Sequence, residues 1–153
     1  AVLIKMIKNF SQYLIEEERE VFFTFGRMNP PTIGHGKVMD VLAQKSGKTD
    51  YKVFVSQTQD AKKNPLSYSD KIKHVRKMFP KHARQVMVEK NVKTAIHALV
   101  SLYYKGYRSI TMVVGDDRIR EFEVLFNKYN GQHARHGFYN FKSININTLI
   151  VDK

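Results

Sequence analysis

A short polar segment directly after an apolar run carries the residues with the clearest chemical potential. Residues 21–25 read VFFTF and predict a buried strand. The segment GRMNPPTIGH then interrupts the strand, and a helix is predicted to start near His35. Arg27, Thr32, His35 and Lys37 can all donate hydrogen bonds to an anion. The pattern therefore suits either an anion site or a connector decorated with polar residues.

The predicted helix start makes phosphate the anion that fits best. A helix N-terminus offers free backbone N–H groups and partial positive charge, and Gly34 lets a ligand approach without a Cβ in the way. Pro30 and Pro31 would stiffen the approach to this helix. The alternative is that Thr32 is only an N-cap and that the neighbouring histidine is incidental. The loop is not a Walker loop, because the G-x-x-x-x-G-K-[ST] pattern is absent.

The charge of the chain predicts an anionic partner. The 153 residues include 26 Lys and Arg against 14 Asp and Glu, a formal net charge of +12. Nucleic acid and nucleotide phosphates are the two partners that this excess favours, and a generally basic surface is the alternative. The cations gather over residues 62–84, which contain one acid, Asp70. They are Lys62, Lys63, Lys71, Lys73, Arg76, Lys77, Lys81 and Arg84.

Several classes of protein are disfavoured. The chain has no Cys, so disulfides and thiolate metal sites are excluded, and it lacks the nucleophile elbow of serine hydrolases and the paired-histidine helix of zinc proteases. His133 and His136 lie in a polar, glycine-bounded stretch that favours a solvated loop over a metal site. No metal-binding side chains are predicted. No apolar run approaches the roughly 20 residues that span a bilayer, so we expect a cytoplasmic protein with no membrane partner.

Predicted strands and helices alternate along most of the chain. The strands are expected at 21–25, 52–56, 85–88, 109–114 and 141–147, and the helices at 36–44, 69–78, 92–104 and 117–128. An amphipathic helix at 5–19 precedes this alternation, so we divide the chain into a leader (1–19) and one domain (20–153). Strands that are apolar on both faces predict an α/β fold, a doubly wound parallel sheet of about five strands with helices on both faces. Sites in such folds lie at the carboxyl ends of strands, where the polar segment begins.

The polar segment also carries a family resemblance. GRMNPPTIGH resembles the His/Thr-x-Gly-His signature of the nucleotidyltransferase superfamily, which implies a Rossmann-like fold. It is similar to archaeal-type nicotinamide mononucleotide adenylyltransferases, whose loop reads Gly-Arg-Phe-x-Pro-x-His-x-Gly-His. Thr32 replaces the first of those histidines, as it does in eukaryotic-type enzymes of the same activity. The resemblance covers about residues 21–147 and extends to nucleotidyltransferase-like proteins of large tailed bacteriophages.

Two further motifs follow in the order of the superfamily, and a third has no match. NPLS at residues 64–67 resembles the Asn-Pro-Phe-Thr segment after strand two, with Asp70 and Lys71 where Glu-Arg is usual. VVGDD at residues 113–117 resembles the Gly-Ser/Asp-Asp turn after strand four. Each also has a local alternative, a turn or a helix cap. Nothing in the final NINTLIVDK fits the late Ser-x-Ser/Thr-x-x-Arg motif that grips the triphosphate, so we expect this arm to be missing.

The resemblance implies transfer of a nucleoside monophosphate, AMP from ATP, to a phosphate-bearing acceptor such as nicotinamide mononucleotide, with release of pyrophosphate. It implies a catalytic role for His35, Thr32 and Arg27, and a Mg²⁺ ion that bridges the phosphates. Acceptor binding is expected at Asn64, Pro65 and Ser67. Nucleotide binding is expected at Gly26, Met28, Asn29, Gly34, Lys37, Gly115, Asp116 and Asp117.

Two other functions stay open at this point. The first is a nucleotide-binding but inactive descendant that serves as a phage structural or packaged protein, located in the virion with head proteins as partners. The second is a nucleic-acid-binding module that uses the basic surface of residues 62–84. Tyr68 and Phe79 lie in that segment, either as stacking platforms for bases or as core residues. An active enzyme encoded by a phage would act in the host cytoplasm.

Overall fold

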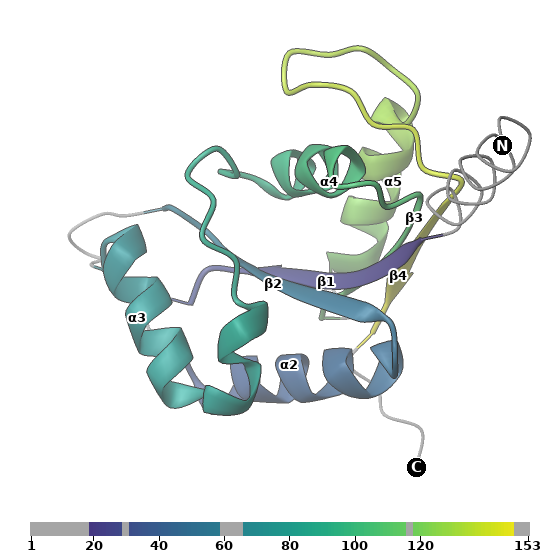
Figure 1. Ribbon diagram of the computed structural model, residues 1–153. Helices are drawn as coiled ribbons and strands as arrows, with labels where there is room; N and C mark the ends of the chain where they lie inside the picture. Colours follow the sequence, from purple (N-terminus) through teal and green to yellow (C-terminus); the bar gives the residue numbers. More distant parts are fainter. Residues whose placement is uncertain (1–18, 29–30, 59–65, 116–117, 149–153) are drawn as a thin grey trace, which may run out of the picture.

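Four parallel strands form the centre of the molecule. The computed structural model describes residues 19–28, 31–58, 66–115 and 118–148, so most of the predicted leader helix lies outside it. The strands β1 (Glu20–Gly26), β2 (Asp50–Val55), β3 (Ser109–Val113) and β4 (Ser143–Asn147) pair in the order β2-β1-β3-β4 (Figure 1). All three pairings are parallel.

Helices cover both faces of this sheet. α2 (Ile33–Ser46) and α3 (Tyr68–Met78) lie on one face, and α4 (Ala95–Tyr104) and α5 (Ile119–Tyr129) lie on the other (Figure 1). The doubly wound α/β fold predicted from the sequence is therefore confirmed. None of the helices in the described parts of the chain is long and apolar enough to cross a membrane.

β1 is an enclosed strand, because helices cover both of its faces. Val21 and Phe23 are fully buried toward α4 and α5, where the Phe23 ring meets Phe54 edge-on at 6.2 Å between centroids. Phe22 packs toward α2 and α3 on the opposite face. A strand that is apolar on both faces forms this way only in a covered parallel sheet, which is what the run VFFTF predicts.

The predicted third strand is the one element that the structure corrects. Pro80–Gln85 forms a short 3₁₀ helix (η1), and the following residues make a single parallel bridge between Val86 and Val53 of β2. The Met87 N–H still donates to the Val53 carbonyl at 2.8 Å, but Val88 already turns outward and is 53% exposed. The segment thus takes the place of a fifth strand beside β2 without continuing the ladder.

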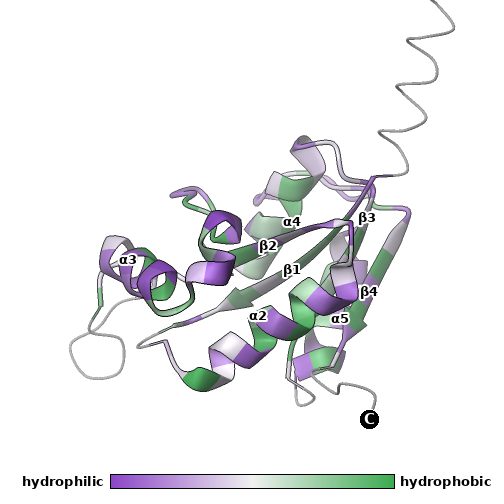
Figure 2. Cartoon of the chain, turned by 60° about the horizontal axis from the view of Figure 1, so that its bottom comes forward, coloured by the Kyte–Doolittle hydropathy of each residue, from purple (hydrophilic) through white to green (hydrophobic). Residues whose placement is uncertain are grey.

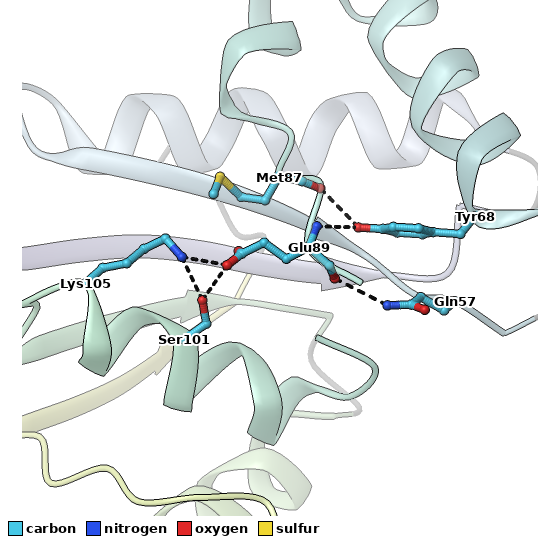
Figure 3. Close-up of polar contacts among 6 residues, drawn as sticks. All are labelled: Gln57, Tyr68, Met87, Glu89, Ser101 and Lys105. Atoms are coloured by element: carbon cyan, nitrogen blue, oxygen red, sulfur yellow. Dashed lines mark hydrogen bonds and ion pairs between the residues drawn. The ribbon is translucent and has the colours of Figure 1, made fainter. Parts of the chain in front are cut away.

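Side chains replace ladder bonds beyond this bridge. The Tyr68 hydroxyl donates to the Met87 carbonyl at 3.3 Å and accepts from the Glu89 N–H at 3.0 Å (Figure 3). The amide of Gln57, just past β2, donates to the carbonyls of Lys90 at 2.7 Å and Val92 at 3.1 Å. Because these groups bond the backbone of residues 87–92, the strand pattern ends although the segment stays ordered.

The Glu89 side chain ties the same segment to α4. One carboxylate oxygen accepts from Lys105 Nζ at 2.6 Å and from the Ser101 hydroxyl at 2.7 Å (Figure 3). The helix then ends at Gly106, whose φ of +102° favours glycine, as the sequence predicts.

Close packing between α2 and the chain after α3 generates a first prediction. A Cβ at Gly36 would meet the Phe79 ring at 2.6 Å, so Gly36→Ala must displace that ring from its place under α2. We expect a net loss of about 1 kcal/mol in the free energy of unfolding, because overpacking of about 1–3 kcal/mol exceeds the gain in helix propensity. Chemical denaturation measures this difference.

Gly34→Ala is the matched control in the same helix. A Cβ at Gly34 meets only the Thr32 hydroxyl, at 3.5 Å, so this variant should be as stable as the unmodified chain or more stable. Equal effects of the two substitutions would contradict the packing argument.

Candidate functional site

The site begins where the strand order changes direction. The chain leaves β1 for β2 on one side and returns to β3 on the other, so the carboxyl ends of β1 and β3 open a crevice. A cavity of about 150 Å³ lies there, with Gly26 and Met28 at the end of β1 and Gly115 after β3. His35 and Arg118 also line it, from the starts of α2 and α5. The missing side chain of Gly26 leaves room for Met28, whose side chain lies 3.2 Å from where a Cβ of Gly26 would be.

The first turn of α2 orients the His35 ring. Thr32 is the N-cap residue, and its backbone N–H donates to His35 Nδ1 at 2.8 Å. The Thr32 hydroxyl oxygen also lies 3.1 Å from the same nitrogen. A backbone N–H can only donate, so Nδ1 must be the unprotonated nitrogen and the neutral ring carries its proton on Nε2. The cap therefore sets the tautomer of His35.

Burial keeps this ring neutral. Desolvation lowers the pKa of His35 below its ordinary value of 6.5, so the neutral form dominates at pH 7. Nε2–H is then a hydrogen-bond donor beside the free N–H groups of the α2 N-terminus. A neutral donor at a helix start suits a phosphate oxygen on which negative charge increases during a reaction.

The turn after β1 holds Arg27 in a constrained backbone. Met28 has a φ of +51°, which is rare for a residue with a side chain, yet it is 1% exposed and packs against the backbone of Gly26. This buried anchor fixes the chain on one side of Arg27. The guanidinium makes no ion pair or hydrogen bond with other described residues. Within the described part of the chain, Arg27 is thus an unpaired cation at the carboxyl end of β1.

A second cavity adjoins the first between α4 and α5. It measures about 310 Å³ and shares Gly26 and Arg118 with the smaller cavity. Arg27, Lys93 and the N-cap residue Thr94 line its polar end. Four large apolar side chains, Phe25, Ile96, Phe122 and Leu125, also line it, together with Ser56, Thr58 and one acid, Glu121, which pairs with Arg118. Cations next to apolar side chains suit a ligand that contains both a phosphate group and a ring.

Lys71 of α3 bonds the chain just after the carboxyl end of β2, at the same edge of the sheet. Its side chain is fully buried, and Nζ donates to the carbonyls of Ser56 at 3.1 Å and Thr58 at 2.6 Å. Burial lowers the pKa of the Lys71 ammonium, and the nearby charge of Arg27 lowers it further. Two cations close to one another, without an acid paired to either in the described chain, raise the local potential toward an anion.

The structure brings together part of the predicted site. Gly26, Arg27, Met28, His35 and Gly115 line the two cavities. Gly34 lies in the exposed first turn of α2. Asn29, Asn64, Pro65, Asp116 and Asp117 lie outside the described residues.

Two predicted residues lie elsewhere. Lys37 points to a different groove, between α2 and η1, and lines neither cavity. The Ser67 hydroxyl accepts from the Asp70 N–H at 3.2 Å, so it caps α3, which is the local alternative for this motif.

Three cations were missed by the sequence reasoning. Arg118 directly follows the GDD turn, and Lys93 directly precedes the N-cap of α4, so both could have been found as basic residues at helix starts. Lys71 carries no such signal, because a lysine in a basic run normally faces solvent.

The histidines at 133 and 136 pack against aromatic rings, with His133 at 4.5 Å from Phe138 and His136 at 4.8 Å from Tyr129. The described residues contain no cluster of three metal-ligating side chains.

The buried lysine generates a second prediction. Lys71→Met leaves the carbonyls of Ser56 and Thr58 without their donor, and we expect a loss of about 1–3 kcal/mol in the free energy of unfolding. Lys73→Met, at an exposed position of the same helix, is the control and should change stability by less than about 0.5 kcal/mol. A Lys71→Met protein as stable as the control would show that water satisfies the two carbonyls.

The His35 ring generates a third prediction. In a nitrogen-15 NMR titration, His35 should protonate below 6.5 and show the Nε2–H tautomer when neutral. The unfolded chain, in which the ring titrates near about 6.5, is the reference. Because folding lowers the pKa, the contribution of His35 to stability is complete above the unfolded value and is lost as the pH falls toward the folded value. An Nδ1–H tautomer would contradict the proposed cap geometry.

Comparison with known families agrees with this arrangement. The family model described as cytidylyltransferase-like matches residues 23–146, which run from β1 to β4 and include every described residue of the two cavities. No curated protein matches the chain. The match covers most of the sequence and supports nucleotidyltransferase activity in general. The chain belongs to the cytidylyltransferase-like family of the nucleotidyltransferase superfamily.

Proposed function

We propose that the protein transfers a nucleoside monophosphate from a nucleoside triphosphate to a phosphate-bearing acceptor and releases pyrophosphate. The observation that carries the proposal is the His35 ring, which the Thr32 N–H holds at the start of α2, in the crevice between β1 and β3, with no bond from Nε2 to another described residue. Family membership supports the reaction class. The resemblance of GRMNPPTIGH to archaeal-type enzymes favours ATP as donor and nicotinamide mononucleotide as acceptor.

The chemistry asks for positioning and charge neutralisation. An oxygen of the acceptor phosphate attacks the α-phosphorus, and the bond from that phosphorus to the oxygen bridging to the β-phosphate breaks. Pyrophosphate leaves with the electron pair of that bond. Negative charge grows on the α-phosphate oxygens and on the leaving group. His35 Nε2–H would donate to those oxygens, the backbone N–H groups of α2 would surround them, and Arg27 would hold a phosphate bidentately.

The two cavities suggest how the substrates divide the site. The smaller one, next to His35 and Gly115, would take the donor with its α-phosphate at the α2 N-terminus. The larger one would take the acceptor, with its phosphate on Arg27, Lys93 and Arg118 and its ring against the apolar wall. This places the acceptor between α4 and α5, in addition to the segment around Ser67 favoured by the resemblance.

A Mg²⁺ ion fits this scheme when the phosphates supply most of its ligands. Mg²⁺ prefers oxygen and is usually held by substrate phosphates with one or two carboxylates, so it does not require a three-residue cluster of the kind that the described residues lack. A bound Mg²⁺ would neutralise charge on the β- and γ-phosphates. The chain itself would still supply the donors at the α-phosphate, through His35 and the start of α2.

The direct test is pyrophosphate release by the purified chain with Mg²⁺. Each of the four ribonucleoside triphosphates is tested with and without nicotinamide mononucleotide. Release that requires ATP and the mononucleotide together supports the adenylyltransferase, and release that requires the mononucleotide with another triphosphate keeps the reaction class and changes the donor. A folded chain that releases no pyrophosphate with any pair would favour the inactive descendant.

His35→Ala generates a fourth prediction. Loss of one donor to a developing charge typically costs about 10²–10³ in turnover, so we expect at least a hundredfold lower rate with an unchanged circular dichroism spectrum.

His97→Ala is the matched control for this substitution. His97 occupies the same place in α4, three residues after the N-cap Thr94, and its Nδ1 accepts from the Lys93 N–H at 3.3 Å. His97 lines neither of the two substrate cavities. The His97→Ala variant should therefore retain the full rate. Equal losses of rate in the two variants would remove His35 from the mechanism.

A further inference from the structure

An apolar groove with a basic rim lies beside the catalytic crevice and takes no part in the proposed reaction. It consists of two cavities of about 450 and 440 Å³ that share Met78, between the first turns of α2 and the end of α3 with η1. We call this surface the α2–α3 groove. Its floor is formed by Pro31, Ile33, Leu66, Met78, Phe79 and Pro80.

The floor of the groove exposes large apolar side chains. Ile33 is 72% exposed and Met78 is 44% exposed, and the two lie on neighbouring helices. Scattered apolar residues on a surface are normal, whereas adjoining ones within a groove are typical of a binding surface.

The rim of the groove is basic. Lys37, His74, Lys77 and Lys81 line it, and none of them has a hydrogen bond or an ion pair to another described residue. Among the described residues that line the groove, the one acid is Asp40, which bonds His82 Nε2 at 2.7 Å. The outer surface of α3 continues the basic character and is largely hydrophilic in Figure 2. Unpaired like charges on adjoining turns repel one another and are stabilised by a polyanion.

We propose that single-stranded nucleic acid binds along the α2–α3 groove. Its phosphates would contact Lys77, Lys81 and the other rim cations, and its unstacked bases would lie on the apolar floor around Ile33 and Met78. A duplex presents its phosphates but keeps its bases stacked inside, so it could use the rim without the floor. Charge complementarity favours this partner, and the proposal goes beyond nucleotidyl transfer, whose substrates fit the two cavities at the strand ends.

The aromatic residues of the basic segment are not the stacking platforms in this arrangement. Phe79 packs its ring against Gly36, and the Tyr68 hydroxyl is bonded between Met87 and Glu89 (Figure 3). Phe79 still contributes to the floor, but its ring packs against Gly36, so the base contacts would be mostly aliphatic, which predicts binding that tolerates any sequence.

The test is fluorescence anisotropy of a labelled oligothymidylate of about 20 nucleotides with the full chain, from about 50 to 200 mM salt. The unmodified protein should bind with an affinity that falls as salt rises. Lys77→Gln/Lys81→Gln should weaken binding about tenfold and reduce the salt slope by about 1.4, since each phosphate contact on a single strand contributes about 0.7. Lys45→Gln/Lys48→Gln, the same charge change at the far end of α2, is the control and should leave both unchanged.

Two comparisons separate a single strand from other polyanions. Met78→Ser should weaken oligothymidylate binding but leave heparin binding unchanged, because only the oligonucleotide has bases for the floor. Pyrophosphate release by Lys77→Gln/Lys81→Gln should equal that of the unmodified chain. The proposed nucleic-acid binding and the proposed nucleotidyl transfer are therefore tested independently. The proposal is overturned if the protein does not bind the oligonucleotide at low salt, or if the groove and control variants lose equal affinity. It is also overturned if Met78→Ser weakens heparin binding as much as oligonucleotide binding, or if ATP displaces the oligonucleotide.

Discussion

The site depends on the pairing of β1 with two parallel neighbours. Because β2 and β3 both bond to β1, its side edges are closed and its faces are covered by helices, so its carboxyl end is where it meets open space. The chain must leave that end in a turn that clears β3, and a positive φ at a buried Met28 achieves this. The segment that follows begins α2 directly at the crevice. The position of the candidate site is thus a consequence of strand order.

Strand order also explains why several cations lie close together in the crevice. Arg27, Lys93 and Arg118 come from three different loops and line the larger cavity, and Lys71 of α3 bonds the carbonyls of Ser56 and Thr58, which also line it. The one ion pair that these cations make with a described residue is the exposed Arg118–Glu121 contact at 3.5 Å. Buried or clustered cations are costly without a counter-charge, and an incoming phosphate would supply it. A bound phosphate would then reduce the electrostatic repulsion among these cations.

Much of the fold could be predicted because periodicity and breakers agree along the chain. The strand at residues 21–25 and the stop at Gly106 carry strong local signals, and both are confirmed. The strand at 85–88 could not be rejected from sequence, because its apolar alternation is genuine and its loss depends on bonds from Tyr68 and Gln57, which are distant in sequence. At the candidate site, the positions of His35 and Gly115 beside the cavity follow from a helix start and a strand end that the sequence shows, whereas the cations around them were not predictable. Burial of Lys71 and the location of Lys37 outside the crevice follow from packing that no local pattern shows.

The cap at the start of α2 couples protonation of the His35 ring to the stability of the first helical turn. Nδ1 of His35 is an acceptor for the Thr32 N–H only while it carries no proton. A proton added there would turn the acceptor into a donor, and the Thr32 N–H would lose its partner while the ring gained a charge attractive to phosphate. Acidification would therefore loosen the first turn of α2 and strengthen its attraction for anions at the same time. A phosphate bound at this helix start should raise the proton affinity of the ring, which would make substrate occupancy and helix fraying thermodynamically linked.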